Sequence, residues 1–211
     1  MSDTRAFVIN YGVMLEAEAN FTLSAILNIE LDSSKALGDS YQSLGFNQKI
    51  TLIQDLKGLN KDTINKLQKF MEIRNKFAHV LKIDSFSAFK TKTQEGKATI
   101  TKLENWYLNK ISDKIKISKN KEEDYRNLFL ELYKDIWQFL QHTKDVHLVE
   151  KHREQSISYL QLGLLEILKQ KLSASNELAK ILENAESEMK EKWEEKKRRD
   201  GFRVPNKGFH E

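Results

Sequence analysis

The sequence contains no cysteine, a single proline (Pro205) and only eight glycines. Without cysteine, disulfides, thiolate metal sites and cysteine nucleophiles are all excluded. So little glycine and proline argues against a turn-rich β protein and favours long helices. No stretch approaches the roughly 20 apolar residues of a membrane-spanning helix, and the start of the chain does not resemble a signal peptide. We therefore expect a helical, cytoplasmic protein without a membrane segment.

Composition allows one domain with a helical extension. Apolar residues make up 39% of the chain and charged residues 31%, which leaves enough apolar material for a core at this length. The net charge of +4 permits contact with nucleic acid but does not by itself argue for it. We expect a helical bundle over residues 1–150, a C-terminal helical extension over 151–199 and a flexible tail over 200–211.

The apolar spacing predicts an all-α antiparallel bundle of about four to six helices with extended C-terminal helices. The expected helices span residues 4–31, 34–44, 47–56, 60–79, 120–149 and 150–199, the last with a break near 173–175. Residues 82–96 look irregular, and residues 97–117 are ambiguous between strand and helix. A short heptad seam near the C-terminus, which we expect to support dimerisation, comprises Leu178, Leu182, Ala185, Met189 and Trp193.

One segment concentrates polar chemistry. The hexad, which we define as residues 74–79, reads Arg-Asn-Lys-Phe-Ala-His and ends a strongly helical run that Asn60 or Asp62 can cap. Asn75 and His79 are four residues apart and share one helix face, whereas Arg74 points toward the apolar face. The hexad is therefore either a functional site or the polar end of a structural helix.

The hexad resembles the signature of the HEPN superfamily, in which an arginine followed by a polar residue precedes a histidine by four to six residues. Arg74, Asn75 and His79 fit that form. The surrounding stretch is similar to the mannitol-operon-repressor-like branch. That branch has a Phe-x-x-Lys-Ile segment, matched by Phe46, Lys49 and Ile50, and a later Phe-bearing segment, matched by Phe86 and Phe89. The resemblance implies a dimeric, metal-independent ribonuclease that needs no cofactor. It also implies a setting in toxin–antitoxin systems or defence, with an antitoxin as a protein partner.

The residue types of the hexad suit this chemistry. RNA carries its own nucleophile, the 2′-OH, so the enzyme must supply a base, an acid and positive charge on the phosphorane. His79 is the candidate acid/base, Arg74 the candidate phosphorane stabiliser, and Asn75 the candidate orienting group. One histidine cannot easily serve as base and acid at once, so a homodimer would divide the work. Further phosphate contacts are expected from three basic residues: Lys49, Lys76 and Lys82.

A structural interpretation of the same residues is also open. Arg74 on an apolar face would pair with a buried carboxylate, and Glu18 in the first helix is the expected structural partner. His79 near a helix C-terminus is favoured there by the helix dipole. In that case the chain is a non-catalytic helical module that binds protein or nucleic acid in a regulatory role.

Overall fold

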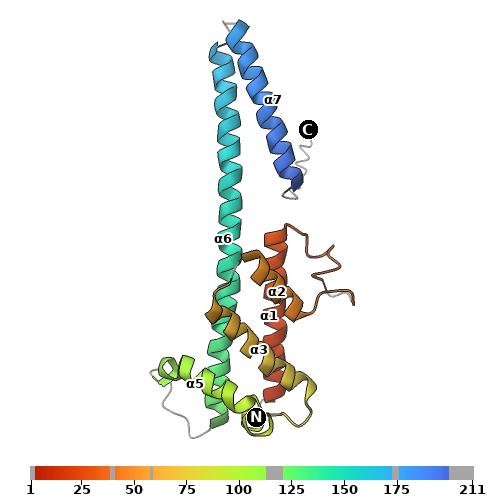
Figure 1. Ribbon diagram of the computed structural model, residues 1–211, viewed down its shortest axis with the longest axis vertical. Coiled ribbons are helices and arrows are strands. Elements are labelled where there is room, and N and C mark those ends of the chain that lie inside the picture. The colour runs from red at the N-terminus through yellow and green to blue at the C-terminus, as the bar shows by residue number, and fades with distance from the viewer. Residues whose placement is uncertain (1–2, 39–40, 58, 113–120, 173–175, 200–211) are drawn as a thin grey trace, which may run out of the picture. The chain divides into compact units, whose positions relative to one another are not determined.

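The computed structural model describes residues 3–38, 41–57, 59–112, 121–172 and 176–199 (Figure 1). Every regular element in these ranges is a helix, so the all-α expectation is confirmed. The helices are α1 (Thr4–Leu27), α2 (Phe46–Lys57), α3 (Lys61–His79), α4 (Phe86–Lys92), α5 (Gly96–Ser112), α6 (Lys121–Leu172) and α7 (Asn176–Arg199).

The chain divides into two compact units. Unit 1 contains Met1–Leu23 and Leu31–Lys144, and unit 2 contains Ser24–Glu30 and Asp145–Glu211. The helix α6 therefore contributes its first part to unit 1 and its remainder to unit 2. The expected tail over 200–211 lies outside the described residues, as do residues 173–175, where a break was expected.

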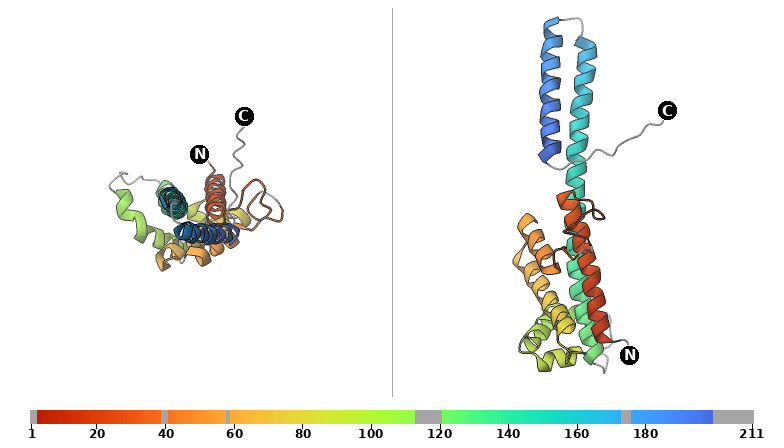
Figure 2. Two further views of the ribbon diagram at one scale, coloured as in Figure 1. Left: turned by 90° about the horizontal axis from the view of Figure 1, so that it is seen from above. Right: turned by 90° about the vertical axis from the view of Figure 1, so that its right-hand side faces the viewer.

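In unit 1, α1 and the first part of α6 run parallel, side by side (Figure 2). Residues that follow one another in α1 contact residues that follow one another in α6. Arg126 Nη2 donates to Thr4 Oγ1 at 2.7 Å, and three residues later in both helices the Phe7 and Phe129 rings lie 6.0 Å apart. The remaining helices of the unit pack on one side of this pair. The helix α3 runs antiparallel to both, because Lys66 of α3 contacts Asp135 of α6, whereas Phe70, later in α3, contacts Phe129, earlier in α6.

Aromatic side chains of α3, α4 and α6 form the core of unit 1. The rings of Phe70 and Phe129 stack at 5.2 Å, and Phe86 lies 5.1 Å from Phe77 and 5.7 Å from Phe129. All four side chains are fully buried. Burial of large apolar rings is the main favourable term in such a core, so α3 is anchored along its length by aromatic packing.

Residues 82–96 contain the helix α4 instead of the expected irregular segment. Its N-terminus is capped twice: Ser85 Oγ accepts a hydrogen bond from the Ala88 amide, and the Glu122 carboxylate accepts from the amides of Phe86 (2.6 Å) and Ser87 (3.0 Å). A carboxylate at a helix N-terminus satisfies amides that have no partner within the helix. Glu122 lies on α6, so local sequence patterns did not reveal this helix.

Two further expectations are corrected, and one ambiguity is resolved. The segment over 34–44 forms turns where it is described, with the Gly38 amide donating to the Ser34 carbonyl at 3.1 Å. The first helix ends at Leu27 and not at residue 31, and Asn28 adopts the left-handed conformation (φ 53°) that commonly follows a helix end. The ambiguous stretch is helical as α5 up to Ser112, and residues 113–117 lie outside the described residues.

Apolar character alone does not mark the buried face of α1. Met14 and Phe21 are large apolar residues but are exposed, whereas Gly12 is buried, as is Glu18, which was expected to be a buried carboxylate. The helix is apolar around most of its circumference, so periodicity alone did not select the buried face.

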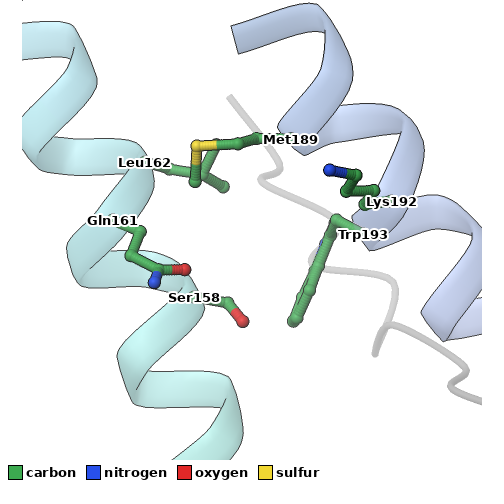
Figure 3. A pocket seen from close by; sticks show the side chains of 6 residues that line it. All are labelled: Ser158, Gln161, Leu162, Met189, Lys192 and Trp193. Atoms are coloured by element: carbon green, nitrogen blue, oxygen red, sulfur yellow. The ribbon is translucent and has the colours of Figure 1, made fainter. Parts of the chain in front are cut away.

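In unit 2, the last part of α6 and α7 pack as a helical hairpin. The Lys169 ammonium pairs with Glu186, which also accepts from Lys190 at 2.5 Å, and the rings of Tyr159 and Trp193 lie 6.1 Å apart. Met189 and Trp193 of the predicted heptad seam face α6 within the same chain across a small hollow (Figure 3). This part of the seam is therefore used to close the hairpin.

We predict that Glu186 makes the hairpin sensitive to acid. Hydrogen bonds from Lys169 and then Lys190 lower the pKa of Glu186 from 4.5 to about 2. Because the folded pKa lies below the unfolded one, this stabilisation is present above pH 4.5 and is lost as the pH falls toward 2. Thermal unfolding of wild type and Glu186→Gln, followed by circular dichroism, should differ above pH 4.5 and converge near pH 2. Glu188→Gln serves as the control; a constant difference across this range would contradict the prediction.

Candidate functional site

The hexad forms the C-terminal end of α3. Asn60, one of the two caps that the sequence offered, caps the start of this helix by accepting a hydrogen bond from the Thr63 amide at 2.8 Å. The helix ends at His79, and the next amide, that of Val80, donates to the Lys76 carbonyl at 3.0 Å. The aromatic core holds this helix through Phe70 and Phe77, so the polar residues of the hexad project from a rigid support.

The Arg74 side chain is held between α3 and α1. A Cβ atom placed on Gly12 would lie only 2.9 Å from Arg74 Cγ, so the arginine stem occupies space that glycine leaves open. Its Nη1 donates to Asn75 Oδ1 at 3.2 Å. Arg74 is half-buried, and within the described part of the chain no carboxylate forms an ion pair with it. The result is a fixed cation whose charge is not neutralised by a salt bridge.

The expected pairing of Glu18 with Arg74 is wrong. Glu18 is buried, but its carboxylate accepts a hydrogen bond from Lys144 Nζ of α6 at 2.9 Å. Arg74 meets α1 at Gly12, six residues earlier, which corresponds to about 9 Å along a helix. Glu18 therefore supports the contact between α1 and α6 and does not belong to the hexad.

His79 is the exposed member of the hexad. It is the last residue of α3, and no hydrogen bond or ion pair joins its side chain to another described residue. Asn75 lies one turn earlier on the same helix and is bound through its carbonyl oxygen to Arg74, which leaves its amide hydrogens to donate elsewhere. An exposed imidazole beside an oriented amide and a fixed guanidinium can bind an anionic ligand and exchange protons with it.

Arg5 is a supporting residue that the sequence did not reveal. From the first turn of α1, its Nη2 donates to the carbonyls of Val80 (2.9 Å), Leu81 (2.9 Å) and Ile83 (2.8 Å). These carbonyls directly follow His79, and that of Val80 also accepts a hydrogen bond from the Ile83 amide at 3.0 Å. One guanidinium thus fixes the backbone on the C-terminal side of the hexad.

The three predicted phosphate-binding lysines lie in different environments. Lys49 is only 2% exposed, and its ammonium pairs with Glu16 at 2.9 Å. The expectation that Lys49 contacts phosphate is therefore wrong. Lys76 is partly exposed and lies 3.3 Å from Glu95, whose pKa is lowered by a hydrogen bond from its own backbone and by Lys76. Lys82 is exposed on the segment that follows the hexad. Two of the three cations therefore remain near His79 at the surface.

A second polar cluster in unit 1 is structurally satisfied. A hollow of about 300 Å³ is lined by Thr63, Lys66, Asp135, Ile136, Gln138 and Phe139. Asp135 accepts hydrogen bonds from Lys66 and Tyr107, both at 2.9 Å. Burial is the larger cause that raises the pKa of Tyr107, and the hydrogen bond from its hydroxyl to Asp135 is the second. The charges of the cluster neutralise one another, so we assign it to packing between α3, α5 and α6.

The described residues contain no group of three histidine, aspartate or glutamate side chains arranged to hold a metal ion. None of their helices combines the length and apolar character needed to cross a membrane. Comparisons of the chain with protein-family models, with curated proteins and with solved structures find no match.

We predict that a methyl group at Gly12 disturbs the Arg74 contact. Gly12→Ala should lower the free energy of unfolding by about 1–3 kcal/mol, because the new Cβ overpacks the arginine stem. Gly163→Ala is the matched control, since nothing lies within 4 Å of a Cβ at that position. It should stabilise its helix by about 0.5–1 kcal/mol. Denaturant unfolding followed by circular dichroism measures both; equal stabilisation would show that the stem moves aside without cost.

We also predict that Arg5 stabilises the segment after His79. Arg5→Ala should lower the free energy of unfolding by about 1–3 kcal/mol, because three carbonyls lose a charged donor. Amide hydrogen exchange in residues 80–83 should accelerate more than exchange in the aromatic core. The exposed neighbour Lys82→Ala serves as the control and should leave the exchange rates of this segment nearly unchanged. Unchanged exchange in Arg5→Ala would contradict the assignment.

Proposed function

We propose that this chain is a HEPN-type, metal-independent endoribonuclease that acts as a homodimer and cleaves RNA by attack of the 2′-OH. The observation that carries the proposal is the environment of Arg74. A half-buried arginine without a carboxylate partner in the described residues is held against Gly12 and Asn75, one and a half turns before an exposed histidine. A positioned cation beside a proton-transfer group is what phosphodiester cleavage requires.

In the proposed reaction, one His79 imidazole accepts the proton of the 2′-OH while the hydroxyl oxygen attacks the adjacent phosphorus. The bond to the 5′-oxygen then breaks, and that oxygen takes a proton from a protonated imidazole. The Arg74 guanidinium, with its planar fork of donors, binds the phosphorane oxygens on which negative charge accumulates. Asn75 holds the guanidinium through its carbonyl oxygen and directs its amide hydrogens toward phosphate. The products carry a 2′,3′-cyclic phosphate and a 5′-hydroxyl.

The division of base and acid between two histidines calls for a second copy of the chain. The outer face of α1 supports this requirement, because Val13, Met14 and Phe21 are between 52% and 58% exposed. Val13 follows Gly12, so this face begins about 100° around the helix from the position where Arg74 packs. The other exposed residues of the face are uncharged, as expected of a surface covered by another chain: Ala6, Asn10 and Ala17. The exposed positions lie about 100–200° around α1 from Gly12, so a second copy can dock on this face without displacing Arg74.

Lys76 and Lys82 would supply phosphate contacts that do not depend on base sequence. By analogy with the HEPN superfamily, we further propose a role in a toxin–antitoxin or defence system, with an antitoxin-type protein as a partner. These assignments rest on the resemblance of the hexad and on the exposure of the two lysines beside it.

A second candidate function is a non-catalytic helical module that binds protein or nucleic acid. The exposed apolar face of α1 favours this reading as well, because such a face suits a partner of any kind. In that case Arg74 and His79 would contribute to binding without proton transfer, and His79→Ala would weaken binding without abolishing a reaction.

We predict cleavage of single-stranded or structured RNA by the wild-type protein in the presence of EDTA. His79→Ala should reduce the rate about 10²–10⁴-fold, the usual contribution of general acid–base catalysis. His142→Ala, which changes an exposed histidine elsewhere in unit 1, should leave the rate unchanged. An RNA with 2′-deoxyribose at the cleaved position should be resistant, and the products should carry 2′,3′-cyclic phosphate. Absence of cleavage of all RNAs, with retained RNA or protein binding, would favour the non-catalytic module.

A further inference from the structure

In unit 2, one face of α6 packs against α7, and the opposite face carries exposed apolar residues. One face lies against α7: Ser158 and Leu162 of α6 line a hollow of about 180 Å³ together with Met189 and Trp193 of α7 (Figure 3). Lys169 continues this face and pairs with Glu186 of α7. This face therefore has its partner within the chain.

The opposite face carries a row of large apolar side chains that nothing covers in the described part of unit 2. We define the α6 stripe as Ile157, Leu160, Leu164 and Ile167, which are between 45% and 73% exposed. Leu160 and Leu164 each follow by two residues a position that lines the α7 hollow, which corresponds to a rotation of about 200° around the helix. The stripe thus points away from α7. An exposed row of this kind marks an interaction surface.

We propose that the α6 stripe binds the same stripe of a second copy of this chain as a parallel two-stranded coiled coil. The four residues follow one another at spacings of three, four and three, which is the a–d spacing of heptads. In register, each side chain of the stripe fits between side chains of an identical row, so a second copy presents matching knobs and holes. This surface lies in unit 2, whereas the hexad and the outer face of α1 lie in unit 1. The proposal therefore does not depend on ribonuclease activity.

The distribution of charge favours a second copy as the occupant. The eleven residues over 155–165 include no charged side chain, so two copies can approach there without like-charge repulsion. One heptad earlier, Glu150 and Arg153 occupy the a and d positions of the same register. Both are exposed, and neither forms an ion pair with another described residue. In a parallel pair in register, the two Glu150 side chains share one layer and the two Arg153 side chains share the next. Glu150 of each copy therefore lies one layer from Arg153 of the other, and the charges of this end balance.

Cysteine crosslinking tests this proposal directly, because this chain contains no cysteine. Leu160→Cys places a thiol in a d layer, where parallel pairing brings the two copies within reach of a disulfide. Glu166→Cys, on the same helix at an exposed outer position, is the matched control. Under mild oxidation of the full chain, non-reducing electrophoresis should show about tenfold more crosslinked dimer for Leu160→Cys than for Glu166→Cys. Neither variant replaces a residue that packs against α7.

Light scattering provides the second measurement. The double variant Leu160→Glu/Leu164→Glu should raise the dissociation constant of self-association about 100-fold or more. Met14→Glu/Phe21→Glu, on the exposed face of α1, should leave the Leu160→Cys crosslink intact. The proposal is overturned by equal crosslinking of the two cysteine variants or by a monomeric wild type. It is equally overturned by preferential crosslinking of Leu160→Cys chains to Leu164→Cys chains, which indicates antiparallel pairing. RNA cleavage without an α6 crosslink would separate this failure from the proposed activity.

Discussion

The arrangement of the hexad depends on the close approach of α3 to α1, which requires that position 12 has no side chain. A Cβ at Gly12 would lie 2.9 Å from Arg74 Cγ, so a larger residue would push the two helices or the arginine apart. Because packing holds the Arg74 stem, its guanidinium is fixed beside Asn75, and no carboxylate of the described residues neutralises it. The positive charge of the site is therefore a consequence of steric fit between two helices. A salt bridge would have fixed the same side chain but cancelled the field that an anionic ligand meets.

Charged side chains from other helices form hydrogen bonds with backbone groups at the ends of the helices around the hexad. Arg5 of α1 donates to the carbonyls that follow α3, and Glu122 of α6 accepts from the amides that begin α4. Each charge has the sign that the adjoining helix end favours. The segment between α3 and α4 is thus bound at both ends, which keeps His79 at a defined position although it is exposed.

Local signals made part of this structure predictable. The cap at Asn60 and the apolar spacing of α3 placed the hexad at a helix end, and low glycine and proline content indicated the all-α class. What the sequence did not reveal depends on which helices meet. Glu18 pairs with Lys144, which is 126 residues away, and Lys49 is buried against Glu16. For the same reason the buried face of α1 does not follow from its sequence, since an apolar helix offers several faces and only its neighbours select one.

The long-range cap of α4 has a consequence for the order of folding. With only seven residues, α4 is too short to be stable as an isolated helix, and its N-terminal amides are completed by Glu122. During synthesis the chain therefore reaches α6 before α4 has its full set of partners. The chain between α4 and Glu122 must lose conformational entropy when it closes into a loop, and only then does the contact stabilise α4. Unit 1 should accordingly assemble late and cooperatively, with its aromatic core, the α4 cap and the hexad support forming together after the start of α6 has left the ribosome.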